Sequence, residues 1–135
     1  MYVKGMATDG KLGEVSQEKT KQRTYTFDEA FRSSKEYFGG DELAARVWAN
    51  KYALKDSYGN LFEQNPDDMH RRLAKEVARI ENRYPNPMNE EQIYELFKEF
   101  KYIIPQGGPM SGIGNKYQIA SLSNCFVIGH KNPAD

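Results

Sequence analysis

Four amphipathic segments, each opened by its own start signal, most constrain what this chain can fold into. Thr26 and Glu29 have the spacing of a capping box, and Asn65 followed by Pro66 is a second helix start. Behind each signal, apolar residues recur at the three- and four-residue spacing of a helix with one buried face. The sequence therefore predicts a mainly α chain, with helices at about 26–38, 41–54, 66–83 and 90–101.

The other two helices also have recognisable starts, with Asp41 as one cap and Asn89 with Gln92 as the other. Each helix leaves an apolar face that another surface must cover. The predicted faces are Phe27, Ala30, Phe31 and Phe38; Leu43, Ala44, Val47, Trp48 and Leu54; Met69, Leu73, Val77 and Ile80; and Ile93, Leu96, Phe97 and Phe100.

Charge divides the chain into three zones. Residues 1–24 are polar and aperiodic, which predicts a flexible lead-in. Residues 25–101 hold nearly all the charge and form the predicted helical region. Residues 102–135 hold three charged side chains, which are Lys116, Lys131 and Asp135, so we expect this last zone to be covered by other structure. At 135 residues, the chain is one domain or part of one.

The overall composition excludes several classes of protein. Nineteen basic residues balance nineteen acidic ones, which gives no support for binding nucleic acid or an anionic membrane. No apolar run approaches the roughly 20 residues of a membrane span, and the start lacks the apolar stretch of a secretory signal. The single cysteine, Cys125, excludes an internal disulfide and a cysteine-rich zinc site. These features predict a cytoplasmic setting.

The last zone differs in character from the helices. Residues 103–115 are predicted to be a glycine-rich loop, and Tyr117 to Ile128 a strand. The strand's end, Cys125 to Ile128, is apolar at every position, which is typical of a strand covered on both faces in a parallel sheet or α/β barrel. A single strand cannot satisfy its own backbone groups, so we expect further strands outside these residues.

Several candidate site residues can also be interpreted as purely structural. The glycine spacing matches neither a dinucleotide fingerprint nor a phosphate-binding loop, so a tight helix-to-strand connection is favoured over a phosphate site. The local sequence around Cys125 favours a buried, unreactive thiol. His70 is expected on a solvated helix face and not at a metal, as are Lys75, Glu76, Arg79 and Glu81.

Four blocks of the chain resemble the start of the catalytic subunit of ribonucleotide reductases, most closely the adenosylcobalamin-dependent class II type. The glycine-rich segment followed by the Ser-Asn-Cys strand is the most specific part of this resemblance. The blocks lie at residues 37–54, 69–76, 105–112 and 121–128, and the resemblance spans about residues 25–130.

The resemblance implies a fold and a site. In this family a helical region precedes a ten-stranded α/β barrel, whose first strand carries a redox-active cysteine matched by Cys125. That thiol gives up reducing equivalents, forming a disulfide with a second barrel cysteine as the ribose 2′-hydroxyl leaves. The implied substrate-binding residues are Gly108, Ser111, Ser123 and Asn124, with Gly108 standing where many members have a hydroxyl residue.

The resemblance also implies partners. These are a ribonucleoside di- or triphosphate, the remainder of the barrel, a thioredoxin-like reductant and, for the full enzyme, a second copy in a homodimer. Adenosylcobalamin would generate the radical, and its binding elements, like the thiyl-radical cysteine, lie further along in the family. The isolated 135 residues are therefore expected to be inactive. Two alternatives remain open: a fragment of a class I large subunit, and a non-catalytic helical interaction module.

Overall fold

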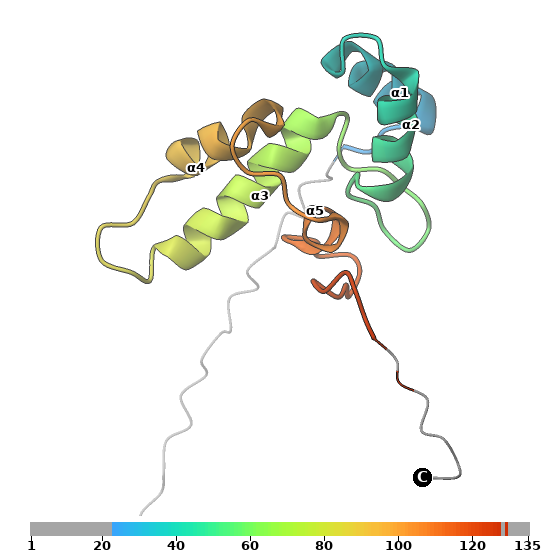
Figure 1. Cartoon of the computed structure of the whole chain (residues 1–135). Coiled ribbons are helices and arrows are strands. Elements are labelled where there is room, and N and C mark those ends of the chain that lie inside the picture. The colour runs from blue at the N-terminus through green and yellow to red at the C-terminus, as the bar shows by residue number, and fades with distance from the viewer. Residues whose placement is uncertain (1–22, 128, 130–135) are drawn as a thin grey trace, which may run out of the picture.

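The computed structural model describes residues 23–127 and 129, and these contain five α-helices (Figure 1). The helices are α1 (Phe27–Tyr37), α2 (Glu42–Lys51), α3 (Pro66–Glu81), α4 (Glu90–Phe97) and α5 (Gly107–Gly112), with a 3-10 turn, η1 (Lys98–Phe100), directly after α4. The four predicted helices are confirmed. Nearly all of the predicted lead-in, residues 1–22, lies outside the described residues.

The predicted caps are present because each depends on residues three positions apart or fewer. In the capping box of α1, the Glu29 amide donates to Thr26 Oγ1 at 3.2 Å, and the Thr26 amide donates to Glu29 Oε2 at 2.8 Å. Asp41 Oδ1 accepts from the Ala44 amide at 2.9 Å at the start of α2. Asn65 and Asn89 cap α3 and α4 in the same way.

The helices form two packed pairs, α1 with α2 and α3 with α4 (Figure 1). One core connects them. Trp48 of α2 and Met69 of α3 are both almost fully buried, and Trp48 Nε1 donates to Met69 Sδ at 3.4 Å. The buried cluster comprises Ala30, Trp48, Ala49, Ala53, Leu61, Met69, Leu73, Ala74, Ala78, Ile93, Tyr94 and Phe97.

Several predictions about which helical side chains face solvent are wrong. Phe27 and Ile80, assigned to apolar faces, are each 37% exposed. Leu43, assigned to the core face of α2, is 73% exposed, because α2 instead buries Ala45 and Ala49, whose small side chains allow close packing. His70, assigned to a solvated face, is fully buried. Its ring packs edge-on against Phe100 with centroids 4.5 Å apart, since η1 folds back onto this side of α3. The solvated face around Lys75 and Arg79 is confirmed.

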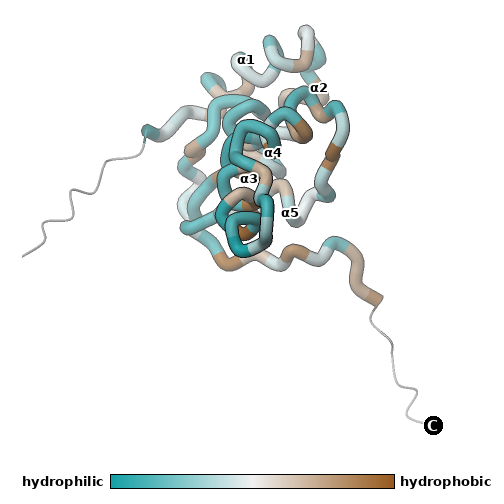
Figure 2. The backbone as a smooth tube through the Cα atoms, turned by 90° about the vertical axis from the view of Figure 1, so that its left-hand side faces the viewer, coloured by the Kyte–Doolittle hydropathy of each residue, from teal (hydrophilic) through white to brown (hydrophobic). Residues whose placement is uncertain are grey.

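The last zone also differs from the sequence prediction. Part of the predicted glycine-rich loop is a helix, α5. No strand forms within residues 117–127, although a strand was predicted there, because the described residues offer it no neighbouring strand. Isolated single bridges, Tyr25–Leu61 and Lys55–Leu61, are the β-type pairings in the described residues. Figure 2 shows the C-terminal end of the described chain running away from the helical body, with hydrophobic residues along it.

Cys125 is exposed, so the prediction of a core cysteine from local sequence is wrong. The predicted strand that would have buried this thiol is not formed in the part of the chain that the structure describes. None of the helices within the described ranges is long and apolar enough to cross a membrane.

Candidate functional site

The glycine-rich helix α5 has little reason to be helical by itself. Its six residues include three glycines and a proline, and each glycine costs about 1 kcal/mol relative to alanine in a helix. Its own helical hydrogen bonds include Met110 N to Gln106 O and Ile113 N to Pro109 O, both at 3.0 Å. Helices this short are unstable in water without outside contacts. Tertiary contacts at both ends therefore decide its conformation.

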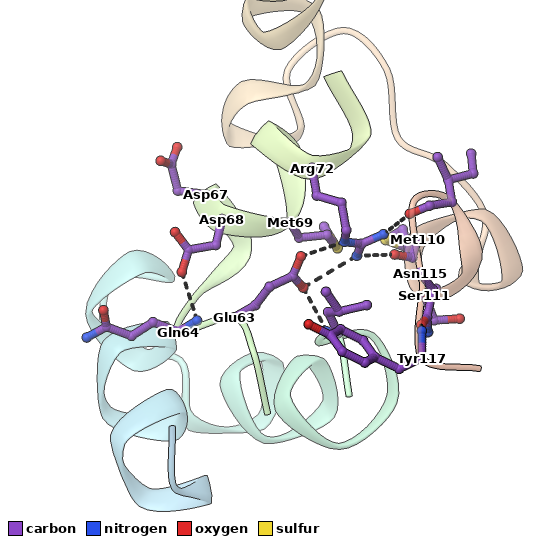
Figure 3. A network of polar contacts seen from close by, with 12 residues as sticks. Glu63, Gln64, Asp67, Asp68, Met69, Arg72, Met110, Ser111, Asn115 and Tyr117 are labelled. Carbon is purple, nitrogen blue, oxygen red and sulfur yellow. Dashed lines mark hydrogen bonds and ion pairs between the residues drawn. The ribbon is translucent and has the colours of Figure 1, made fainter. Parts of the chain in front are cut away.

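Arg72 of α3 binds the C-terminal end of α5 (Figure 3). Its Nη2 donates to the Met110 carbonyl at 2.7 Å, and its Nη1 donates to the Ile113 carbonyl. The last carbonyls of a helix lack partners within the helix, and a positive charge there is also favoured by the helix dipole. Arg72 is thus a tertiary C-cap for α5.

Glu63 holds Arg72 in place. Arg72 Nε donates to Glu63 Oε1 at 2.6 Å, and the two side chains are 10% and 4% exposed. The Leu54 amide also donates to Glu63 Oε2, at 2.8 Å. Burial raises the pKa of Glu63, while the hydrogen bonds and positive charge of Arg72 oppose that rise. The pair therefore places a positive guanidinium directly against the buried carboxyl group.

Asn124 binds the opposite end of α5. The Gly108 amide donates to Asn124 Oδ1 at 2.6 Å, and Asn124 Nδ2 donates to Gln106 Oε1 at 2.6 Å. A Cβ atom at Gly108 would lie 2.6 Å from Asn124 Oδ1 and 3.2 Å from the Ser121 carbonyl. Glycine is needed at this position because the returning chain approaches the α5 backbone so closely.

The predicted substrate-binding residues are only partly brought together. Gly108 and Asn124 are hydrogen-bonded, and Ser111 lies one turn along α5, where its hydroxyl donates to the Gly107 carbonyl at 3.0 Å. Ser123 and Cys125 are exposed on the segment that leaves the body, and the Ser123 amide donates to Ser121 Oγ at 3.2 Å. The helical body thus supports one part of the predicted site, and the rest of it extends outward.

A cleft of about 780 Å³ lies beside the Glu63–Arg72 pair. On one wall, the rings of Phe62 and Tyr117 stack with centroids 4.0 Å apart and planes within 4°. The lining residues are Arg23, Tyr25, Leu54, Phe62, Glu63, Asp68, Arg72, Lys75, Glu76, Arg79, Gly114, Lys116 and Tyr117. Among residues 23–127 and 129, no cluster of three or more His, Cys, Asp or Glu side chains could hold a metal ion.

Sequence reasoning missed Glu63 and Arg72 as parts of this site. Arg72 lies two residues after His70, which was predicted on a solvated helix face, and Glu63 lies in a non-helical connection without periodicity. The buried ion pair that joins them spans nine residues, and the contact from Arg72 to α5 spans about forty. The only signal in the sequence was that Arg72 belongs to one of the blocks of family resemblance.

The fold is therefore an all-α domain whose final glycine-rich helix is fixed at both ends. Residues 38–112, more than half of the chain, match the family described as ribonucleotide reductase, all-alpha domain. The chain belongs to this family. The match runs from the residue after α1 to the end of α5, so it includes Gly108 and Ser111 and stops before Asn124 and Cys125. No curated protein and no solved structure gives a significant match.

Proposed function

We propose that this chain is the N-terminal part of a ribonucleotide reductase that converts ribonucleotides to 2′-deoxyribonucleotides, and that the enzyme is of the adenosylcobalamin-dependent class II type. The observation that carries the proposal is the family match, which covers α5 and two of the predicted substrate-binding residues. The class assignment comes from the sequence resemblance, since the family match does not separate class II from class I.

Substrate binding is proposed at Gly108, Ser111, Ser123 and Asn124. The support for it is the contact between the α5 backbone and Asn124, which holds the residue before Cys125 against the glycine-rich helix. A ribonucleotide bound across α5 and this segment would therefore lie near the thiol of Cys125. Backbone amides and small polar side chains are suitable groups for hydrogen bonds to phosphate and ribose oxygens.

Cys125 is proposed to supply one of the two thiols for the reduction. The ribose 2′-carbon loses its hydroxyl as water and gains a hydrogen, while two thiols lose two electrons and two protons and form a disulfide. The second thiol must come from outside these residues, because Cys125 is the chain's single cysteine. The exposure of Cys125 fits a thiol that must meet both a substrate and a partner cysteine. A thioredoxin-like dithiol would then reduce the disulfide.

The last zone is proposed to form the first strand of the ten-stranded barrel. Ile119, Phe126 and Val127 are 106%, 67% and 100% exposed, which is unusual for a run of apolar side chains in a folded protein. Pairing with neighbouring strands would bury these side chains and satisfy the backbone. The proposed partners of this zone are thus the remaining strands of the barrel.

Adenosylcobalamin, when bound, would supply the radical that starts the reaction. The residues described do not fit this cofactor: they hold no cluster suited to a metal, and the cleft beside Glu63 is lined mainly by charged side chains. Its binding elements are therefore proposed to lie elsewhere in the enzyme, and the role of this chain is confined to substrate and thiol. The reducing chemistry also motivates the proposed cytoplasmic location, and a homodimer is proposed for the full enzyme.

One structural observation favours the alternative of a non-catalytic helical module. The helices bury a core of twelve residues without any barrel strand in the described part of the chain. The reading frame beyond Asp135 separates the two proposals: further strands and cysteines support a reductase, and a stop codon supports the module.

The function is tested with the full-length gene product, incubated with ribonucleoside di- or triphosphates, a dithiol and adenosylcobalamin. We expect deoxyribonucleotide that depends on the cobalamin. A folded full-length protein that forms product only with a separate radical-generating subunit would contradict the class II assignment and support class I. A folded protein that neither binds ribonucleotides nor forms product under either condition would contradict the reductase function.

A further inference from the structure

We propose that Arg72, held by Glu63, is a positioning residue that sets the substrate-binding geometry of α5 from within the helical domain. The inference rests on the proposed function, because it assigns a role toward the ribonucleotide site. It adds two residues that lie outside the predicted substrate-binding set and that do not touch the reacting atoms.

Arg72 is itself rigidly placed. It projects from α3, the longest helix, between His70 and Leu73, both of which are fully buried. Its guanidinium meets Glu63 at 2.6 Å, and a Cβ atom at Gly114 would lie only 3.0 Å from Arg72 Cγ. The Arg72 side chain is thus packed along its stem and paired at its head, so its donors have fixed directions.

Arg72 binds α5 at two carbonyls with one planar group. The Met110 and Ile113 carbonyls accept from Nη2 and Nη1. A guanidinium can serve the carboxylate and both carbonyls at once, because its five donors point in fixed directions. A lysine has one ammonium centre and cannot reproduce this arrangement.

Helix α5 connects Arg72 to the proposed substrate-binding residues. Gly108 and Met110 are two positions apart on α5, and helical rise is about 1.5 Å per residue, so α5 is short enough to move as one body. Its other end is bonded through Gly108 to Asn124. Movement of the Arg72 end would therefore displace Gly108, Ser111 and Asn124 relative to a bound ribonucleotide.

The experiment compares Arg72→Lys and Arg72→Met in the full-length enzyme. Amide hydrogen exchange reports on residues 106–115, and steady-state kinetics report kcat and KM for the ribonucleotide. We expect at least a 10-fold faster exchange in α5 and at least a 10-fold higher KM, with kcat changed less than 3-fold. Exchange in α2 and α3 should rise less than exchange in α5, because the lost ion pair destabilises the whole domain while α5 also loses its C-terminal donor.

The matched control is Arg79→Met, which removes the same charge from the same helix. Arg79 also lines the cleft, but it pairs with Glu76 at 2.6 Å, and no hydrogen bond or ion pair joins it to α5 among the described residues. We expect wild-type KM and wild-type α5 exchange in this variant. An equal rise in KM would show that the effect is general electrostatics, and it would overturn the role given to Arg72.

A double variant separates the loss of the α5 contact from a general loss of stability. Removing Arg72 alone leaves Glu63 as a buried carboxylate without its partner, which is destabilising. Arg72→Met with Glu63→Gln removes both charges while α5 still lacks its C-terminal donor. The positioning role predicts that KM stays raised in this double variant, and a return to the wild-type KM would overturn it.

Two results for the single variants also overturn the inference: unchanged exchange in α5, and faster exchange in α5 with an unchanged KM. Failure of the proposed function would be seen separately, because a wild-type enzyme that binds no ribonucleotide contradicts it before any variant is made.

Discussion

His70 should make the stability of this domain depend on pH. The side chain is fully buried, and its Nε2 has no hydrogen-bond partner among the described residues, while Nδ1 lies 3.5 Å from the Tyr37 hydroxyl. Burial lowers the pKa of His70 from 6.5 to about 4, and the nearby Asp67 carboxylate opposes part of that change. Phe100 contacts the ring from η1 and contributes no charge.

The direction of this pH dependence follows from the number of protons that the folded and unfolded states bind. In the unfolded chain this histidine binds a proton near pH 6.5, and in the folded chain only near pH 4. The unfolded state therefore holds more protons between these values, and the folded state loses stability as pH falls through this window. The shift of about 2.5 pKa units corresponds to a loss of at most about 3 kcal/mol by pH 4.

The measurement is urea unfolding of wild type and His70→Leu at pH 7, 6, 5 and 4, followed by the fluorescence of Trp48. Carboxylates such as Glu29 and Glu76 have lowered pKa values and also reduce stability in acid, but both proteins contain them. The difference in unfolding free energy between the two proteins isolates His70. We expect this difference to shift by about 2–3 kcal/mol toward the variant at pH 4. A difference that stays constant across the range would refute the reasoning.

Three further predictions follow from the core, from α5 and from the cysteine count. Leu73→Ala should lower the free energy of unfolding by about 2–5 kcal/mol in urea titrations, because Leu73 is fully buried; a loss below 1 kcal/mol would contradict the core assignment. Gly108→Ala should weaken ribonucleotide binding to the full enzyme about 10-fold by displacing Asn124. A folded Gly108→Ala enzyme with the wild-type affinity would contradict the contact's role. These 135 residues alone should form no deoxyribonucleotide with adenosylcobalamin and a dithiol, since Cys125 is their single thiol; measurable product would contradict this.

The helices were predictable because their determinants are local. A capping box needs only Thr26 and Glu29, three residues apart, and the helical period is read within a few turns. The environment of His70 was not predictable in the same way. It depends on η1 returning to α3 some thirty residues later, and no local pattern records that return.

The conformation of the glycine-rich segment was also not predictable from its local sequence. Its composition argues for a loop, yet Arg72 and Asn124 fix it as α5 through contacts distant in the sequence. The strand predicted at 117–128 is not formed within residues 117–127 for a related reason. A strand needs a ladder of hydrogen bonds to a neighbouring strand, and the described residues contain no such neighbour. The predicted site is accordingly formed only in part. Gly108, Ser111 and Asn124 lie together, while Ser123 and Cys125 are exposed.

The central claim, that Cys125 is a redox-active thiol of a ribonucleotide reductase, is tested most directly by Cys125→Ser in the full-length protein. Serine is nearly isosteric, and Cys125 is exposed in this domain, so the melting temperature and ribonucleotide affinity should stay close to wild type. Turnover should collapse, because a hydroxyl cannot supply the electrons that a thiolate supplies. A folded Cys125→Ser variant that still turns over many times with a dithiol would contradict the account and leave Cys125 without a role in the reduction.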